Sequence, residues 1–469
     1  MTPLRDLTDK RVLVVGLGKS GLGAARLALS KGARVVAFDE RAPEKLDAAA
    51  RDALVREGAE LACGARPPEA RTALFRDAAL VVVSPGFPLA RPEVAAARAA
   101  GVPVVGEVEF ASWFLDPRAA VIGISGTNGK STVTALTGAL CAAGGRATFA
   151  GGNLGEALSN AVLSGRPLDV AVVELSSFQL EGIETFHPRV ACLTNLTPDH
   201  IDRYADHAAY GAAKKRIFRN QTAADFGVVN ARDEGVCRLI EGERCRRFSF
   251  GCGAPADDGA HFCDGLITLR LGGAEERYRL DNLNLRGPHN AENAMAAIVC
   301  ARLAGVDAAS VQKGLDAYPG LSHRMESLGS IDGVEFINDS KATNVDSTLV
   351  ALRSFARGLR LIAGGRGKGL PYQPLVELAP GRIEGVLAIG EDAPLIRAAF
   401  AGVVPVEDCG TLEAATRAAF AAARAGDVVL LSPACASYDQ FKNFEVRGDA
   451  FRQIVQGLRE EREGARDGR

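Results

Sequence analysis

Short apolar runs alternate with longer stretches of helical pattern along most of the chain, as in open α/β sheets. Near the start, an apolar strand over 12–15 is followed by a glycine-rich turn, a helix over 22–30 and a strand over 34–38. This βαβ pattern predicts a small dinucleotide-fold-like domain over 1–110. Its ligand should lie at the carboxyl edge of the sheet, where the turn at Ser84 also follows an apolar strand.

The same alternation predicts two further α/β domains. A central domain over 111–321 should contain a mostly parallel sheet, with strands at 120–124, 169–173, 190–194 and 227–229. Between 244 and 285, short strands separated by Gly and Asp turns predict an antiparallel insert. We expect the third domain, over 322–469, to be an open α/β sheet with a last helix from residue 438 and a disordered, charged tail from about 459.

A glycine-rich loop follows the strand at 120–124 and opens a helix. It reads Gly126-Thr127-Asn128-Gly129-Lys130-Ser131-Thr132. In such a loop, backbone N–H groups bind phosphate oxygens, the lysine neutralises the outer phosphates, and the hydroxyl beside it binds Mg2+. The longer form of the motif needs glycine where this chain has Ile124, so the loop is of the shorter G-x-x-G-K-S kind. It predicts binding of a nucleoside triphosphate.

A second glycine-rich turn lies in the first domain, with Gly16, Gly18 and Gly21 spaced as G-x-G-x-x-G and Asp39 about twenty positions on. Alone, this spacing suggests NAD. However, Lys19 within the turn suits a phosphate, and no histidine of the dehydrogenase kind follows. We therefore predict an anion at the helix N-terminus and keep an NAD-dependent oxidoreductase as the alternative from a different class.

Composition narrows the class of protein. The 469 residues are 47% hydrophobic and 24% charged, which suits about three packed domains. The net charge of −2 argues against a nucleic-acid partner. Because the first ten residues are polar and no apolar run reaches about eighteen residues, we expect no membrane insertion and a cytoplasmic location. The ten cysteines form no Cys-x-x-Cys pair, which argues against zinc and favours reduced thiols.

Two motifs that follow strands of the central domain carry candidate metal ligands. Glu174 comes directly after an apolar strand, and a carboxylate at a strand end beside a phosphate loop is well placed to bind Mg2+. The other interpretation of Glu174 is a helix N-terminal glutamate that interacts with the helix dipole. His200 stands between Asp199 and Asp202, which makes it a candidate ligand as well as a candidate core histidine.

Several motifs stand together in the order and spacing of one family. Besides the loop at 126–132, they are 174–179 (Glu-Leu-Ser-Ser-Phe-Gln), 195–200 (Asn-Leu-Thr-Pro-Asp-His), 210–214 (Tyr-Gly-Ala-Ala-Lys), 287–293 (Gly-Pro-His-Asn-Ala-Glu-Asn), 322–324 (Ser-His-Arg), 337–344 (Ile-Asn-Asp-Ser-Lys-Ala-Thr-Asn) and the segment 431–444. Over nearly its whole length the chain resembles the Mur ligases.

The resemblance implies ATP-dependent amide bond formation in the synthesis of peptidoglycan precursors. ATP would convert the carboxylate of UDP-N-acetylmuramoyl-L-alanine into an acyl phosphate, which the amine of D-glutamate then attacks. Lys130 and the loop amides would bind the β- and γ-phosphates. Two Mg2+ ions would be held by Ser131, Glu174, His200 and Lys214, the last of these as a carbamate. Lys215 is adjacent to Lys214, so the register is open by one residue.

The resemblance also assigns residues to three small-molecule ligands, which we expect a monomer to bind. Adenosine would contact Asn290, Asn293, Arg324 and Asp339. D-glutamate would contact Lys341, Thr343, Lys368, Ser437 and Phe444. The UDP-linked substrate would contact Lys19, Ser20, Asp39, Arg41, Ser84 and Asn153. The glycine-rich segment around Lys368 has no Ser or Thr after the lysine, so we favour a carboxylate-binding loop over a second phosphate loop.

Other ligases of this superfamily are the nearest alternatives. A folylpolyglutamate synthetase is disfavoured, because about a hundred residues of dinucleotide-fold-like domain precede the phosphate loop. A sister ligase that adds L-alanine stays open. The pair Thr127-Asn128 and the segment 441–444 (Phe-Lys-Asn-Phe) favour D-glutamate.

Overall fold

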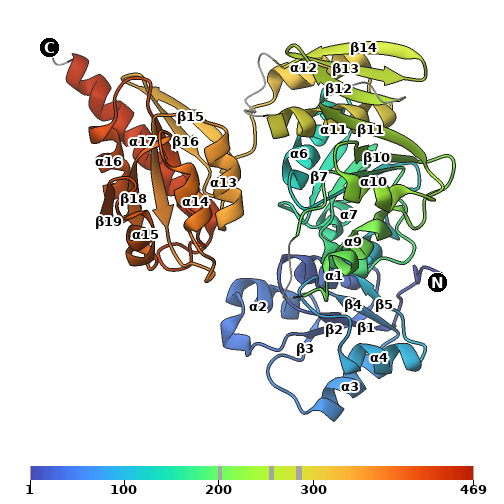
Figure 1. Ribbon diagram of the computed structural model, residues 1–469. Helices are drawn as coiled ribbons and strands as arrows, with labels where there is room; N and C mark the ends of the chain where they lie inside the picture. Colours follow the sequence, from blue (N-terminus) through green and yellow to red (C-terminus); the bar gives the residue numbers. More distant parts are fainter. Residues whose placement is uncertain (1, 199–202, 253–257, 281–287, 468–469) are drawn as a thin grey trace. The chain divides into compact units, whose positions relative to one another are not determined.

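The computed structural model describes residues 2–198, 203–252, 258–280 and 288–467 (Figure 1). The chain forms two compact units, the first comprising the described residues up to Tyr318 and the second beginning at Pro319. Three sheets with flanking helices confirm the predicted three-part α/β fold, with two sheets in the first unit and one in the second.

The first sheet has five parallel strands in the order β3-β2-β1-β4-β5. The strands are β1 (Arg11–Val15), β2 (Arg34–Phe38), β3 (Glu60–Leu61), β4 (Leu80–Val83) and β5 (Val104–Gly106). The helices are α1 (Lys19–Ser30), α2 (Ala48–Arg56), α3 (Pro68–Arg76), α4 (Pro92–Ala99) and α5 (Glu107–Ser112). Helix α1 begins at Lys19, within the glycine-rich motif and three residues earlier than expected. The carboxyl ends of β1, β2 and β4 therefore meet at one edge, as the βαβ pattern predicted.

The central sheet has nine strands in the order β14-β13-β12-β11-β10-β9-β6-β8-β7. They are β6 (Ala120–Ser125), β7 (Thr148–Gly152), β8 (Val170–Glu174), β9 (Val190–Leu193), β10 (Phe226–Asn230), β11 (Arg246–Cys252), β12 (Gly259–Cys263), β13 (Leu266–Leu271) and β14 (Ala274–Arg279). The antiparallel insert expected over 244–285 is wrong for β11 and β12, which pair in parallel and extend the main sheet from β10. Phe248 and Phe250 are buried there, so β11 contributes an apolar face to the core. Among the described residues of this sheet, antiparallel pairing is confined to β12 with β13 and β13 with β14, and β14 forms the sheet edge.

Helices cover this central sheet. They are α6 (Lys130–Ala143), α7 (Leu158–Leu163), α8 (Ser177–Glu181), α9 (His207–Lys215), α10 (Glu234–Ile240), α11 (Pro288–Leu303) and α12 (Ala308–Ala317). Helix α11 is apolar nearly all round, and its residues from Ala294 to Ala301 are buried. A helix of this kind belongs in a core, where it fixes the position of its polar first turn.

The first two sheets share one hydrophobic core and are joined through two buried glutamates in α5. Glu107 accepts hydrogen bonds from the backbone N and the Oγ of Ser159, at 2.7 and 2.6 Å. Glu109 accepts from the backbone N of Thr185 at 2.8 Å and of Phe186 at 2.7 Å. These bonds hold the first domain against the central domain.

The second unit contains a six-stranded sheet in the order β15-β16-β20-β17-β18-β19. Its strands are β15 (Glu326–Ile331), β16 (Val334–Asn338), β17 (Leu359–Gly364), β18 (Ile383–Ile389), β19 (Val406–Gly410) and β20 (Val428–Leu431). Its helices are α13 (Val345–Arg353), α14 (Gln373–Leu378), α15 (Ala393–Phe400), α16 (Leu412–Ala422) and α17 (Phe444–Asp467). Strands β16, β20 and β17 are parallel neighbours, so their carboxyl ends lie at one edge.

Two expectations for the end of the chain are corrected. The last helix begins at Phe444, six residues later than expected, and it continues to Asp467 through the segment expected to be a disordered tail. Leu458 is buried, Arg459 donates to the carbonyl of Leu328, and Arg462 lies 3.4 Å from the carboxylate of Asp332. These contacts tie the charged end of α17 to β15 and the turn after it. Within the described ranges, no helix is long and apolar enough to cross a membrane.

Candidate active site

The phosphate loop connects β6 to α6 and depends on two glycines with positive φ. Gly126 has φ +141°, and a Cβ on it would lie 1.9 Å from Oγ1 of Thr194. Gly129 has φ +83°, and a Cβ there would lie 2.3 Å from Oδ1 of Asn293. Both positions therefore require glycine for conformation and for space. The close contact also places Asn293, a predicted adenosine residue of α11, against the loop.

The end of β9 is bonded to the same loop. Thr194 Oγ1 donates to the carbonyl of Asn128 at 2.5 Å, and the Asn195 carboxamide accepts from the Asn128 backbone N at 2.7 Å. Thr127 Oγ1 donates to the carbonyl of Thr197 at 3.1 Å. These bonds bring the motif at 195–198 onto the phosphate loop. The predicted ligand His200, with Asp199 and Asp202, lies outside the described residues.

The polar side chains at the start of α6 point to phosphate chemistry. Lys130 Nζ donates to the carbonyls of Gly126 at 3.0 Å and of Thr127 at 2.7 Å, so the ammonium lies over the loop. Ser131 and Thr132 are buried in the first helical turn. Backbone N–H groups at a helix N-terminus with an adjacent ammonium form a site for polyphosphate.

Glu174, at the end of β8, has the environment of a metal ligand. The residue is buried, and its Oε1 accepts from Nδ2 of Asn153 at 2.7 Å. Its Oε2 is buried without a hydrogen-bond partner among the described residues. A buried carboxylate oxygen without a partner is costly unless a cation binds it, and hard oxygen ligands suit Mg2+. The donor set of Ser131 and Glu174 therefore fits a Mg2+ ion, and Asn153 orients the carboxylate.

The structure separates the two adjacent lysines of α9. Lys214 is 1% exposed, donates to the carbonyl of Gly126 at 2.6 Å, and lies 4.6 Å from the ring centroid of Tyr210. Lys215 is partly exposed and pairs with Glu243 at 3.1 Å. The predicted register therefore places Lys214 on the phosphate loop and Lys215 away from it. Tyr210, which the sequence indicates only as part of the motif at 210–214, also reaches the loop, because its hydroxyl lies 3.3 Å from Oγ1 of Thr127.

The two asparagines of α11 form one buried pair. Asn293 Nδ2 donates to Oδ1 of Asn290 at 3.0 Å. Because Asn293 also lies against Gly129, both predicted adenosine residues of the first unit are beside the phosphate loop. Arg324 and Asp339 belong to the second unit.

In the first domain, the glycine-rich turn is closed by Ser84. Its Oγ donates to the carbonyl of Gly16 at 2.7 Å, and a Cβ on Gly21 would lie 1.7 Å from the same carbonyl oxygen. The sequence placed Ser84 at this sheet edge, and the structure joins it directly to the turn. Lys19 is exposed and Ser20 is half-buried in the first turn of α1.

Asp39 is bonded to protein groups on both carboxylate oxygens. One oxygen accepts from the backbone N of Leu17 at 2.8 Å, and Arg41 pairs with the carboxylate at 2.8 Å. Burial opposes ionisation, but the hydrogen bonds from Arg41 and Leu17 lower the pKa of Asp39 overall. The carboxylate therefore fixes the turn, and this contact was not foreseen from the sequence.

In the second unit, Asp339 follows β16 and is buried beside Ser432, which follows β20. Ser432 Oγ donates to Asp339 at 2.8 Å, and the backbone N of Met325 donates at 3.2 Å. Burial raises the pKa of Asp339 to about 7, against the effects of the Ser432 hydrogen bond and the charge of Arg324. The predicted adenosine residues Arg324 and Asp339 therefore interact electrostatically.

The predicted D-glutamate residues are brought together in part. Lys341 Nζ lies 5.8 Å from the ring centroid of Phe444. Ser437 is buried and follows β20, Thr343 is half-buried after β16, and Lys368 is exposed after β17. All five belong to the carboxyl edge of this sheet or to the start of α17.

Sequence reasoning missed one buried cation beside these groups. Arg447 of α17 is 1% exposed and donates to Oγ and the carbonyl of Ser340 and to the carbonyl of Cys435. It thereby joins the segments that follow β16 and β20. One feature of the sequence could have indicated Arg447 as a site residue: it stands three residues after Phe444, the last residue of the final motif.

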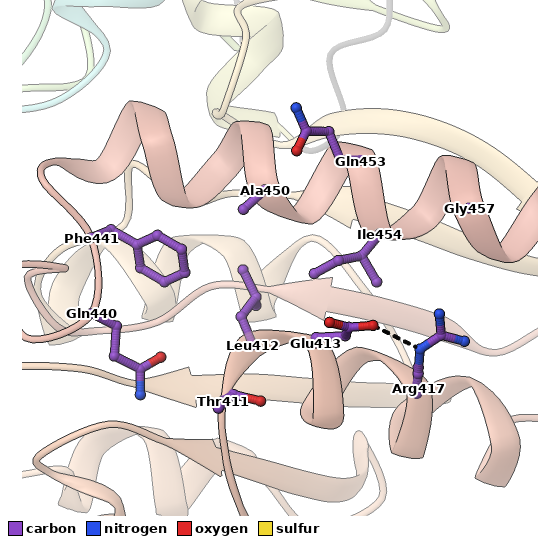
Figure 2. Close-up of a pocket in the computed structure, with 10 residues that line it drawn as sticks. All are labelled: Thr411, Leu412, Glu413, Arg417, Gln440, Phe441, Ala450, Gln453, Ile454 and Gly457. Carbon is purple, nitrogen blue, oxygen red and sulfur yellow. Dashed lines mark hydrogen bonds and ion pairs between the residues drawn. The ribbon is translucent and has the colours of Figure 1, made fainter.

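The second unit also has a hollow between α16 and α17 (Figure 2). Figure 2 shows that side chains of α16, α17 and the segment at 440–441 line it, among them Leu412, Phe441 and Ile454. None of the predicted site residues lines it. In the second unit, the predicted site residues therefore belong to the strand ends and the start of α17 and not to this hollow.

Comparison with known proteins identifies the family. Three family models match in succession: the Mur ligase MurD-like N-terminal domain at 10–106, the Mur ligase middle domain at 124–301, and the Mur ligase glutamate ligase domain at 323–435. The chain belongs to the Mur ligase family. The models match segments of all three predicted domains of this Mur ligase, whereas an NAD-dependent oxidoreductase would use only the first.

Relatives at high identity carry one name. The UDP-N-acetylmuramoylalanine--D-glutamate ligase of Myxococcus xanthus is 54% identical, covering 96% of this chain and 99% of the relative. That of Anaeromyxobacter dehalogenans is 53% identical, covering 96% and 98%. Among solved structures, the UDP-N-acetylmuramate-alanine ligase of Thermotoga maritima has TM-score 0.58 at 19% identity, covering 96% of this Mur ligase and 99% of that chain. That likeness shows the shared fold.

Proposed function

We propose that this Mur ligase adds D-glutamate to UDP-N-acetylmuramoyl-L-alanine, with ATP as co-substrate, in the synthesis of peptidoglycan precursors. The observation that carries the proposal is the near-full-length identity of 54% and 53% to two relatives named for that reaction. The site geometry agrees, because a phosphate loop, a buried carboxylate and a set of groups suited to a dicarboxylate occur in one chain. We also propose a cytoplasmic monomer, which light scattering after size exclusion tests.

The chemistry assigned to the first unit is phosphoryl transfer to a carboxylate. A carboxylate oxygen of the substrate attacks the γ-phosphorus of ATP, the bond to the bridging oxygen breaks, and ADP leaves. Lys130 and the loop N–H groups neutralise the transferring phosphoryl group. Ser131, Glu174, His200 and the carbamate form of Lys214 would hold Mg2+, which supplies further charge neutralisation when bound.

The second step forms the amide. The amine of D-glutamate attacks the acyl carbon, phosphate leaves, and the amine loses a proton. Lys341 and Lys368 would bind the carboxylates of D-glutamate, with donors from Thr343 and Ser437. Lys19, Ser20 and Ser84 would hold the diphosphate at the start of α1, with Asp39, Arg41 and Asn153 supporting the rest of the substrate.

A phosphate-release assay tests this function directly. Full activity is expected only with ATP, Mg2+, UDP-N-acetylmuramoyl-L-alanine and D-glutamate together, and no nicotinamide should be consumed. Equal turnover with L-alanine and UDP-N-acetylmuramic acid would contradict the proposal and favour the sister ligase.

A further inference from the structure

Four arginines gather at the carboxyl edge of the first sheet, namely Arg41, Arg66, Arg71 and Arg91. Three of them pair with carboxylates: Arg41 with Asp39 at 2.8 Å, Arg71 with Glu93 at 2.9 Å, and Arg91 with Glu40 at 2.8 Å. The pair of Arg71 and Glu93 joins α3 to α4, and the other two pairs hold the loop after β2. The charges of these three arginines are compensated by carboxylates of the protein itself.

Arg66 differs from the other three because it forms no ion pair with a described residue. It lies between β3 and α3, and its Nε, like that of Arg71, is buried without a hydrogen-bond partner in the described part of the chain. A buried guanidinium N–H that lacks an acceptor costs free energy. An acceptor from a bound ligand would remove that cost.

The loop that carries Arg66 is fixed to the loop after β2. The backbone N of Gly64 donates to the carbonyls of Asp39 at 2.9 Å and of Arg41 at 3.0 Å. Arg66 is close enough to act electrostatically on the thiol of Cys63, as Asp39 and Arg41 do. Arg66 therefore lies beside two residues already assigned to the UDP-linked substrate.

Sheet order indicates which part of a nucleotide reaches Arg66. A diphosphate belongs at the turn after β1, where α1 begins. In this sheet β2 lies beside β1 and β3 lies beyond β2. Adjacent strands are about 4.8 Å apart, so β3 is roughly 10 Å from β1. That distance separates Arg66 from the phosphates and places it on the side to which the base extends.

We infer that Arg66 recognises the uracil base of the UDP-linked substrate by donating a hydrogen bond to a ring carbonyl oxygen. The inference rests on the proposed function and adds base recognition to it. Uracil presents a carbonyl acceptor where cytosine presents an amino donor. A guanidinium has only donors, so it attracts the first group and is repelled by the second.

Binding of UDP and CDP to the full-length protein tests this inference by calorimetry. Wild-type protein should prefer UDP. Arg66→Met keeps the apolar stem and should weaken UDP binding about tenfold, the worth of about 1.4 kcal/mol, while CDP binding changes by less than about twofold. Arg76→Met is the matched control, because Arg76 is exposed in the last turn of α3, the helix that follows Arg66, and it should bind as wild type.

Each other result would overturn the inference. Unchanged UDP binding by Arg66→Met would remove Arg66 from the site, and equal weakening of UDP and CDP would assign it to the phosphates. If Arg66→Met unfolds at a lower temperature than wild type, the binding test uses the Arg66→Lys variant instead. That variant keeps the charge, should lose part of the preference for UDP, and overturns the inference if the preference is intact. A wild-type protein that does not bind UDP would overturn the proposed UDP-linked substrate as well.

Discussion

Lys214 and Gly126 are 88 residues apart in the chain, and the lysine Nζ donates to the glycine carbonyl at 2.6 Å. This bond places a buried nitrogen of α9 on the phosphate loop. A carbamate on that nitrogen would present hard oxygen atoms next to the groups that we assign to Mg2+.

We predict that Lys214→Ala reduces phosphate release by at least about a hundredfold, because it removes a ligand of the Mg2+ that would neutralise the reacting phosphoryl group. Lys215→Ala is the control and should stay close to wild type, since Lys215 pairs only with the partly exposed Glu243 among the contacts described for it. If the nitrogen carries a carbamate, acetate should partly restore the Lys214→Ala enzyme. Exchanged phenotypes would shift the assigned residue by one position.

Glu174→Gln should abolish turnover without loss of folding. The carboxylate has one buried oxygen without a partner, so the neutral amide leaves packing intact while it removes the negative charge needed for a cation. We expect a fall in rate of about a hundredfold or more at saturating ATP, with a thermal unfolding midpoint equal to or above that of wild type. A lower midpoint with preserved activity would assign Glu174 to structure. A titration of Mg2+ against activity distinguishes weaker metal binding from slower chemistry.

Asp339 should make stability depend on pH. Its pKa is raised by burial from 3.8 to about 7, so the folded state holds the proton more tightly than the unfolded chain. The contribution is present below about pH 4 and is lost as pH rises to about 7, by up to about 4 kcal/mol. Urea unfolding of the full chain between pH 5 and 8 measures this slope, and Asp339→Asn should flatten it. An unchanged slope in that variant would contradict the prediction.

The two buried glutamates of α5 should respond differently to the same substitution. Glu109 accepts hydrogen bonds on both oxygens, including those from the N–H groups of Thr185 and Phe186. In the Gln variant, the side-chain NH2 group would replace one of these acceptor oxygens and would point at an N–H donor. We expect Glu109→Gln to lower the free energy of unfolding by about 2–4 kcal/mol. Glu107 has one oxygen without a partner, and burial raises its pKa, so Glu107→Gln should change stability by less than about 1 kcal/mol. Equal losses in urea titrations would show that the two junction contacts are equivalent.

The phosphate loop could be predicted because all its signals are local. Glycines, lysine and hydroxyls stand within seven residues, between a strand and a helix. The pairing of β11 and β12 could not, because a short apolar strand does not reveal the direction of its neighbour. The sequence also did not predict the hydrogen bond from Leu17 to Asp39, because it joins residues 22 positions apart through a backbone N–H group.

The prediction of a disordered tail from about residue 459 was wrong because it relied on the charged composition of the segment and not on the helical spacing of the apolar residues before it. Phe451, Val455 and Leu458 are buried at spacings of four and three, which marks one apolar face of a helix. Arginines on the same helix then reach backbone and carboxylate acceptors of the sheet, so a polar segment is held without an apolar face of its own. Composition alone favoured disorder there, but the preceding apolar face anchors the helix.

The outer strand of the nine-stranded sheet also bears on how the protein behaves at high concentration. An open sheet edge offers unpaired N–H and C=O groups to any other strand that approaches it. Strand β14 occupies that edge, and Glu275, Arg277 and Arg279 are exposed along it. A second copy that tried to add its own β14 in parallel would bring like charges together at each of these positions. The charged strand should therefore oppose in-register parallel pairing of this edge between two copies.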